Sequence, residues 1–258
     1  APASITKDDL TVQPIESNIT SMRIAFISDL HSCLHALDTV IDDCQKRGAE
    51  RIFCLGDVVD MGPEPEQVVQ RLQALNIPTI RGNHDTLDEH PAAPFLRELE
   101  DWTRTQLTAA STKWLGDLPM SLFEEVEHAR LLMVHGSPYS NTEGLLAETP
   151  AEKINQWLNE SGANIILAGH THVPLVRHVR AGTAINVGST SVPFAEANVV
   201  PPIGLPFSDY VILDLQDGAT TVEQIRIPMD LAALAKAVKL ADMPHAKTFL
   251  GTWLNQII

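Results

Sequence analysis

The chain has 258 residues, and 44% of them are hydrophobic, which is enough to build one sizeable core. Its formal net charge of −15 repels a phosphate backbone at long range, so the composition argues against non-specific binding of nucleic acid. No apolar run reaches the length of a membrane span, so we expect no membrane partner.

The cysteines and the first residues bear on the compartment and the domain boundaries. Cys33, Cys44 and Cys54 lie inside or beside apolar runs, and no pair of them has the spacing of a zinc site. We therefore expect buried free thiols and a reducing, cytoplasmic compartment. Residues 1–21 are polar and lack the basic-then-apolar pattern of a signal peptide, so we interpret them as an N-terminal arm of unknown role. Residues 22–258 are expected to form a single domain.

From Met22 onward, short apolar runs recur, and each of them stops at a polar residue or a glycine. Short uninterrupted runs with such boundaries are typical of strands that are buried on both faces. The strands expected in the first part of the chain are residues 24–28, 52–55, 77–80, 131–134 and 165–168. Apolar residues between them recur at helical spacing, for example Leu34, Leu37 and Ile41, which predicts intervening helices and therefore βαβ units.

The second half of the chain changes character. Strand-like runs follow one another at 184–187, 210–215 and 222–227, which predicts a layer of largely antiparallel strands. Helical stretches are expected over 230–258. The segment 191–209 is rich in proline, nearly uncharged and too long for a simple connector. Because loops of this kind usually cover a site, we expect this one to border the substrate.

Polar residues at the ends of the first five runs carry the functional signal. Each run is followed by Asp, Asn or His, and in α/β sheets ligand sites lie just beyond the carboxyl ends of the strands. Taken alone, each short motif is equally typical of a helix cap, a turn or a surface loop. These alternatives do not explain why such a motif follows each of the five predicted strands. The residues concerned are Asp29, His31, Asp57, Asn83, His84, His135, His170 and His172.

This mixture of carboxylate, amide and imidazole suits a pair of divalent cations. Hydrolysis of a phosphate ester places charge on the leaving oxygen, and two adjacent cations neutralise the phosphate oxygens and turn water into hydroxide near neutral pH. A carboxylate that bridges two ions about 3.5–4 Å apart, together with neutral imidazoles, meets this need. With oxygen and nitrogen donors and no cysteine, the set favours Mn, Fe, Co or Zn over a structural zinc site.

The order of the motifs resembles that of the calcineurin-like metallophosphoesterases. The matching string is Asp29-x-His31, Gly56-Asp57-x-x-Asp60, Gly82-Asn83-His84-Asp85, His135 and Gly169-His170-x-His172. The resemblance spans residues 22–215, and shorter echoes such as Asn186-Val187-Gly188-Ser189 are similar to a bacterial, phosphodiesterase-like branch. It implies a fold of the α+β or α/β class, a four-layer α/β/β/α sandwich with mixed central sheets.

The resemblance also implies a role for each matching residue. The expected metal ligands are Asp29, His31 and His172 for one ion, Asn83, His135 and His170 for the other, and Asp57 as a bridge. His84 would protonate or position the leaving oxygen, and Asp60 would orient His84. The implied cofactors are two divalent transition-metal ions, with Mn or Fe preferred and Zn, Co or Ni allowed. The implied reaction is in-line attack of a metal-bound hydroxide on phosphorus.

One departure from the family's phosphoprotein phosphatases bears on the substrate. Those enzymes carry an arginine directly after the position of Asp60, where it grips phosphate, and here Met61 stands in its place. Arg81 matches a second arginine of those enzymes but cannot replace that clamp.

Cleavage of phosphodiesters and cleavage of phosphomonoesters are therefore almost equally expected. The missing arginine favours a small phosphodiester or nucleotide-type substrate. A phosphomonoesterase or phosphoprotein phosphatase is the alternative. A non-catalytic metal-binding interaction scaffold is the rival from another class. The acidic composition, without a basic stripe, makes a nucleic-acid polymer an unlikely partner, and the sequence leaves the oligomeric state open.

Overall fold

A computed structural model describes residues 21–87, 94–197 and 202–254. Residues 1–20, nearly all of the expected arm, lie outside the described residues, and the first strand begins at Ser21. Among the residues that the structure describes, every helix is too short or too polar to cross a lipid bilayer.

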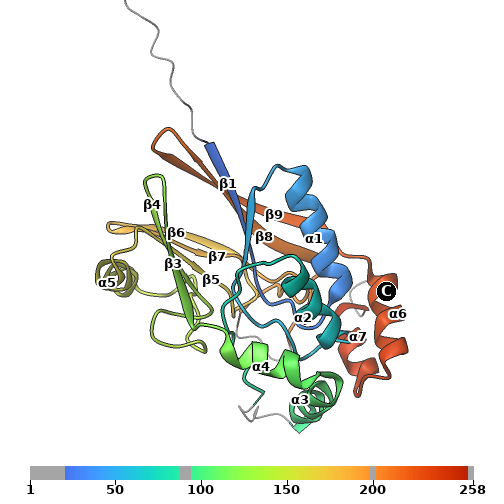
Figure 1. Ribbon diagram of the computed structural model, residues 1–258. Helices are drawn as coiled ribbons and strands as arrows, with labels where there is room; N and C mark the ends of the chain where they lie inside the picture. Colours follow the sequence, from blue (N-terminus) through green and yellow to red (C-terminus); the bar gives the residue numbers. More distant parts are fainter. Residues whose placement is uncertain (1–20, 88–93, 198–201, 255–258) are drawn as a thin grey trace, which may run out of the picture.

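Two mixed β-sheets lie face to face (Figure 1). The first contains, in spatial order, β2 (Arg51–Cys54), β1 (Ser21–Ile27), β8 (Phe207–Gln216) and β9 (Ala219–Pro228). Only β1 and β2 are parallel in it. The second contains β3 (Ser121–Val126), β4 (Ala129–Val134), β5 (Ile165–Ala168), β7 (Gly182–Asn186) and β6 (Leu175–Val179). Its central β4, β5 and β7 are parallel, and β3 and β6 pair antiparallel at its edges.

Apolar side chains on alternate positions of the strands explain this arrangement. Ile24 and Phe26 of β1 point between the sheets, where they join Met133 of the second sheet in one buried cluster. Ala25 and Ile27 point to the opposite face of the first sheet and pack in a second cluster. A strand with both faces covered is apolar at every position, which is why its sequence shows an uninterrupted run.

Helices cover the outer faces of both sheets. On the first sheet, α1 (Leu34–Lys46) and α2 (Pro65–Ala74) contribute Leu37 and Val68 to the outer cluster. On the second sheet, α5 (Ala151–Ser161) contributes Trp157. The layers therefore run helix, sheet, sheet, helix (Figure 1), and the four-layer mixed α/β fold expected from the sequence is confirmed.

The remaining helices flank the first layer. They are α3 (Pro94–Gln106), α4 (Ala109–Asp117), α6 (Leu231–Ala241) and α7 (Ala246–Leu254). A further apolar cluster joins Ala36 of α1, Leu99 of α3 and Leu234 of α6. Residues 255–258, the end of the expected helical stretch, lie outside the described residues.

Three expectations about strands and loops were wrong in part. Residues 77–80 form a single bridge from Thr79 to Cys54 rather than a strand, because Pro78 has no N–H to donate to a ladder. The run 184–187 overlaps β7, which ends at Asn186 and pairs parallel to β5 in the second sheet, so the later strands do not form one antiparallel layer. The expected loop 191–209 ends earlier, because β8 begins at Phe207.

Candidate metal centre

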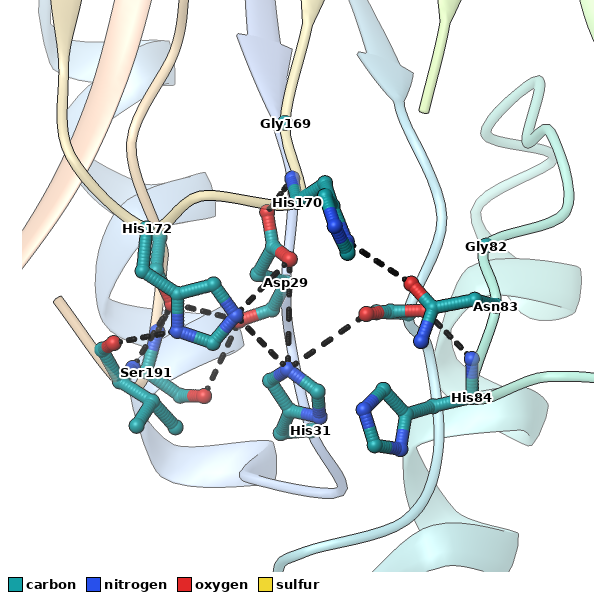
Figure 2. A network of polar contacts seen from close by, with 12 residues as sticks. Asp29, His31, Gly82, Asn83, His84, Gly169, His170, His172 and Ser191 are labelled. Atoms are coloured by element: carbon teal, nitrogen blue, oxygen red, sulfur yellow. Dashed lines mark hydrogen bonds and ion pairs between the residues drawn. The ribbon is translucent and has the colours of Figure 1, made fainter. Parts of the chain in front are cut away.

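The candidate centre lies where strands of both sheets end (Figure 2). Asp29 and His31 follow β1 and Asp57 follows β2, all in the first sheet. His135 follows β4, and His170 and His172 follow β5, in the second sheet. Asn83, His84 and Asp60 come from loops beside them. The structure thus brings together every residue that the sequence singled out, although the segment before Asn83 is not a strand.

Five of the expected metal ligands have a left-handed backbone. They are Asp29 (φ 54°), His31 (φ 40°), Asp57 (φ 51°), His170 (φ 68°) and His172 (φ 59°). Non-glycine residues seldom adopt this conformation, which costs about 1–3 kcal/mol each and persists only where the surroundings fix it. Here the N–H groups of Asp29 and His31 donate to the carbonyls of Gly56 and Asp57, at 3.0 and 2.9 Å. The neighbouring loops therefore hold each other in the conformation that aims the side chains inward.

Two glycines allow these loops to approach closely. A Cβ on Gly56 would collide with the backbone of Gly82, and a Cβ on Gly82 would collide with the Asp57 carboxylate. Gly56 also has φ 93°, which disfavours any other residue. The glycines of the two motifs thus serve the contact between the loops that carry Asp57 and Asn83.

The first ligand group consists of Asp29, His31, Asp57 and His172, whose ligand atoms all lie within 4.8 Å of one another. Nδ1 of His172 donates to the Val192 carbonyl at 2.6 Å, so a neutral ring turns the lone pair of Nε2 inward. That Nε2 lies 3.1 Å from Oδ1 of Asp29 and 3.2 Å from Nε2 of His31. Oδ1 of Asp29 is buried without a hydrogen-bond partner. Converging lone pairs with an unsatisfied buried oxygen fit a cation between them.

The second group consists of Asp57, His135 and His170. Nδ1 of His135 donates to the Leu55 carbonyl at 2.7 Å, which again turns Nε2 inward. Oδ1 of Asn83 lies 3.1 Å from that Nε2 and 2.9 Å from Nδ1 of His170, so the amide oxygen joins this group. Asp57 belongs to both groups, and its Oδ2 lies 3.2 Å from Nε2 of His135 and 3.7 Å from Nε2 of His31. The donor set therefore fits two cations that share one carboxylate.

Buried charges shift the proton affinities of these groups. Burial opposes a charge on His135, but the neighbouring Asp57 outweighs it and raises the pKa of His135 to about 10. Burial lowers the pKa of His31 to about 4. The Asp57 pKa stays well below its usual value despite burial, because His135 and His84 stabilise the carboxylate. A ligand imidazole must be neutral, so cation binding is coupled to release of protons.

His84 lies beside the ligands, and its ring is turned towards a different partner. The backbone N–H of His84 donates to Oδ1 of Asp57 at 2.9 Å, and the ring Nδ1 lies 2.7 Å from Oδ2 of the buried Asp60. Burial of the ring opposes protonation, but the charge of Asp57 and the hydrogen bond to Asp60 raise the His84 pKa to about 9. Nδ1 then donates to Asp60, and Nε2 carries the proton that the ring can give away.

Residues 22–216 match the model of the calcineurin-like phosphoesterase superfamily domain. The chain belongs to this superfamily. With its two histidine and aspartate groups, this phosphoesterase is a metal-dependent enzyme that hydrolyses phosphoric esters.

Relatives of the phosphoesterase match most of its length. An uncharacterized protein of Methanocaldococcus jannaschii is 28% identical over 247 residues, which cover 88% of this chain and 98% of the relative. Phosphodiesterase YfcE of Escherichia coli strain K12 is 27% identical over 182 residues, which cover 67% and 81%. The crystal structure of a metallophosphoesterase from Sphaerobacter thermophilus is 25% identical, with a TM-score of 0.69 and coverage of 90% and 99%. A hypothetical protein from Pyrococcus horikoshii shares the fold, with a TM-score of 0.73 at 20% identity and coverage of 89% and 97%.

The structure adds Asp85 to the residues that build the centre. Its buried carboxylate accepts hydrogen bonds from the N–H groups of Asp57 (3.0 Å), Val58 (2.8 Å), Val59 (3.2 Å) and Gly82 (2.8 Å). It therefore ties together the two loops that carry Asp57 and Asn83. Its place directly after His84 in the motif was the only signal in the sequence, and it gave no role.

Arg81 lies against α4 and not against the ligand groups of the phosphoesterase. Its Nη1 donates to the Gly116 carbonyl at 3.2 Å, and its Nε lies 3.4 Å from the sulfur of Met120. At the other position of the arginine clamp described above stands the uncharged Met61.

Proposed function

We propose that this phosphoesterase hydrolyses a phosphodiester or nucleotide-type substrate, and that the two groups described above hold its cations. The proposed ligands are Asp29, His31, Asp57 and His172 for one ion, and Asp57, Asn83, His135 and His170 for the other. One observation carries the proposal, namely that both groups share the Asp57 carboxylate. Two such ions, when bound, neutralise phosphate oxygens and lower the pKa of water. The mixed oxygen and nitrogen donors favour Mn or Fe in this role.

His84 is proposed to give its Nε2 proton to the leaving oxygen. Its Nδ1 bond to the buried Asp60 fixes the ring and the tautomer, so the proton remains on the nitrogen that faces outward from that carboxylate. A positioned acid of this kind contributes most when the leaving oxygen is strongly basic. Asp60 acts through His84 and is a positioning residue.

The charges near the centre support a diester over a monoester. A phosphomonoester carries up to two negative charges near neutral pH and a diester carries one, so a diester needs fewer cationic side chains. Arg81 is engaged with Gly116, and Met61 is uncharged. The relative named phosphodiesterase, at 27% identity, agrees with this preference.

A metal-reconstitution assay tests the proposal. The chain is stripped by a chelator, reloaded with Mn²⁺, and supplied with bis(p-nitrophenyl) phosphate or p-nitrophenyl phosphate. We expect restored hydrolysis with a higher kcat/KM for the diester, and no activity in Asp57→Asn. A higher kcat/KM for the monoester would identify a phosphomonoesterase. Full metal content without hydrolysis of either ester would favour the scaffold.

A further inference from the structure

A cavity of about 250 Å³ lies beside the candidate metal centre. Residues 145–148 form one wall, and residues 195–197 form a second wall. Thr171 and residues 173–175 complete the lining between them. A water molecule takes up roughly 30 Å³ in the liquid, so the cavity has room for an organic group of several heavy atoms.

The residues directly before both walls lie close to histidines of the centre. Thr171 stands between His170 and His172 in the chain. Phe194, directly before the second wall, stacks on the His172 imidazole, with ring centroids 4.6 Å apart and an angle of 17° between the planes. Gly144, directly before the first wall, packs so closely that a Cβ there would collide with the Thr171 methyl and lie 3.7 Å from Cδ2 of His170. Through Thr171, the cavity therefore adjoins the loop that carries His170 and His172, one residue of each ligand group.

The lining favours an apolar occupant without negative charge. Leu145, Val173 and Leu175 are among the apolar residues that line the cavity, and its lining contains no lysine or arginine among the residues that the structure describes. Its charged lining residues are Glu148 and Glu196, both exposed. These carboxylates repel an anion and attract a cation, whereas the apolar surface stabilises hydrocarbon groups.

The basic residue nearest in sequence to the cavity lining, Arg177, binds backbone carbonyls. Nη1 of Arg177 donates to the carbonyls of Leu146, Ala147 and Thr149, which holds the first wall in place. Its hydrogen bonds are thus made to the backbone of the wall, and it offers no phosphate site inside the cavity.

We propose that this cavity binds the organic group esterified to the phosphate of the substrate, and that this group is apolar and either neutral or cationic. The inference rests on the proposed phosphodiesterase function, because a diester keeps a second organic group beside the reacting phosphorus. A second phosphate or a carboxylate in the same place would face the two glutamates.

Three p-nitrophenyl diesters test the proposal directly. Their second ester group is methyl, 3,3-dimethylbutyl or choline, and the last two have the same shape but differ in charge. Burial of each methylene improves binding about fourfold, so we expect kcat/KM for the dimethylbutyl ester to exceed that for the methyl ester at least tenfold. Equal values for these two esters would overturn the proposal.

The charge comparison uses the same pair of isosteres. We expect the choline ester to be hydrolysed at least as efficiently as the dimethylbutyl ester. Any preference for choline should disappear when Glu148→Gln and Glu196→Gln are combined. A clear preference for the neutral ester in the unaltered chain would overturn the assignment of a cation-tolerant site.

Two substitutions fill the cavity, one from each wall, and a third substitution outside the cavity is their matched control. Ala147→Leu and Ala195→Leu replace exposed alanines, one in each wall, so each is compatible with folding. Each substitution should lower the ratio of kcat/KM for the dimethylbutyl ester to kcat/KM for the methyl ester several-fold. Ala110→Leu makes the same change on the exposed surface of α4, outside the cavity lining, and should leave the ratio unchanged. An unchanged ratio in both filled variants would overturn the proposal.

A binding measurement separates this inference from the proposed function. Saturation-transfer NMR with 3,3-dimethylbutanol needs no turnover. We expect a signal from the unaltered chain and from Ala110→Leu, and its loss in Ala147→Leu and Ala195→Leu. If no diester is hydrolysed while this pattern holds, the phosphodiesterase function fails and the cavity assignment stands. A signal that persists in both filled variants would exclude the cavity as the binding site.

Discussion

Asp85→Asn replaces one buried carboxylate oxygen with an amide group that can only donate. Oδ1 of Asp85 accepts from Val58 and Val59, and Oδ2 accepts from Asp57 and Gly82, all from backbone N–H groups. An asparagine oxygen can serve one of these pairs. Its NH₂ group would then face the other pair of donors, so two buried N–H groups would lose their acceptor.

The cost follows from those two groups. A buried donor without a partner costs about 1–3 kcal/mol, so the loss amounts to about 2–6 kcal/mol of unfolding free energy. Burial and the neighbouring Asp57 charge raise the Asp85 pKa to about 6, and removal of that charge relieves part of the repulsion. We therefore expect a value in the lower half of the range, with the chain still folded.

Urea denaturation of the metal-free protein measures this difference. Asp38→Asn is the matched control, because it makes the same chemical change in an exposed ion pair with Arg71 and should cost less than about 1 kcal/mol. The metal content of Asp85→Asn should also fall, since Asp57 and Asn83 lose their common anchor. A free-energy change equal to that of the control, with full metal content, would refute the anchoring role.

The remaining predictions concern the centre itself. Asp57→Asn should lose both ions, because the Asp57 carboxylate belongs to both groups, whereas His135→Ala should release mainly one ion. Metal analysis after dialysis gives the metal content of each variant. Full metal occupancy in Asp57→Asn would contradict the bridging role of Asp57. His84→Ala should keep both ions and lose about 10²–10⁴-fold in kcat on alkyl esters, but less on nitrophenyl esters, whose leaving oxygen needs little proton donation. Parallel loss of metal would instead make His84 a ligand. Asp60→Asn should show a weaker form of the His84→Ala pattern, with the conservative variant Asp60→Glu recovering part of it.

The sequence predicted all four strands of the first sheet and the central strands of the second, and it missed β3 and β6 at the edges of the second sheet. β1 and β5 are covered on both faces and show uninterrupted apolar runs, which are easily recognised. β3 and β6 lie at the edges of the second sheet, where Glu124 and Arg177 interrupt the pattern. Their pairing depends on neighbours in space and leaves little trace in composition.

The candidate site was predictable for a similar reason, and its limits are physical too. Asp29, Asp57 and His135 come within three residues of the ends of buried strands, so the topology brings them to the same end of the sandwich. The acceptor role of Asp85 depends on donors 26 to 28 residues away in the chain, as well as on Gly82. The engagement of Arg81 with Gly116, 35 residues away, could not be inferred from a motif that places the arginine next to Gly82.

Each ligand group takes side chains from both sheets, and this has a mechanical consequence. Asp57 follows a strand of the first sheet, and His135 and His172 follow strands of the second. A bound cation would therefore cross-link the two sheets at one end of the sandwich. The apolar cluster between the sheets, which includes Ile24, Phe26 and Met133, also holds the two sheets together, by contacts that tolerate small sliding. Coordination tolerates far less, so loading the ions should slow hydrogen exchange at the ends of β2 and β5 more than in the centre of either sheet.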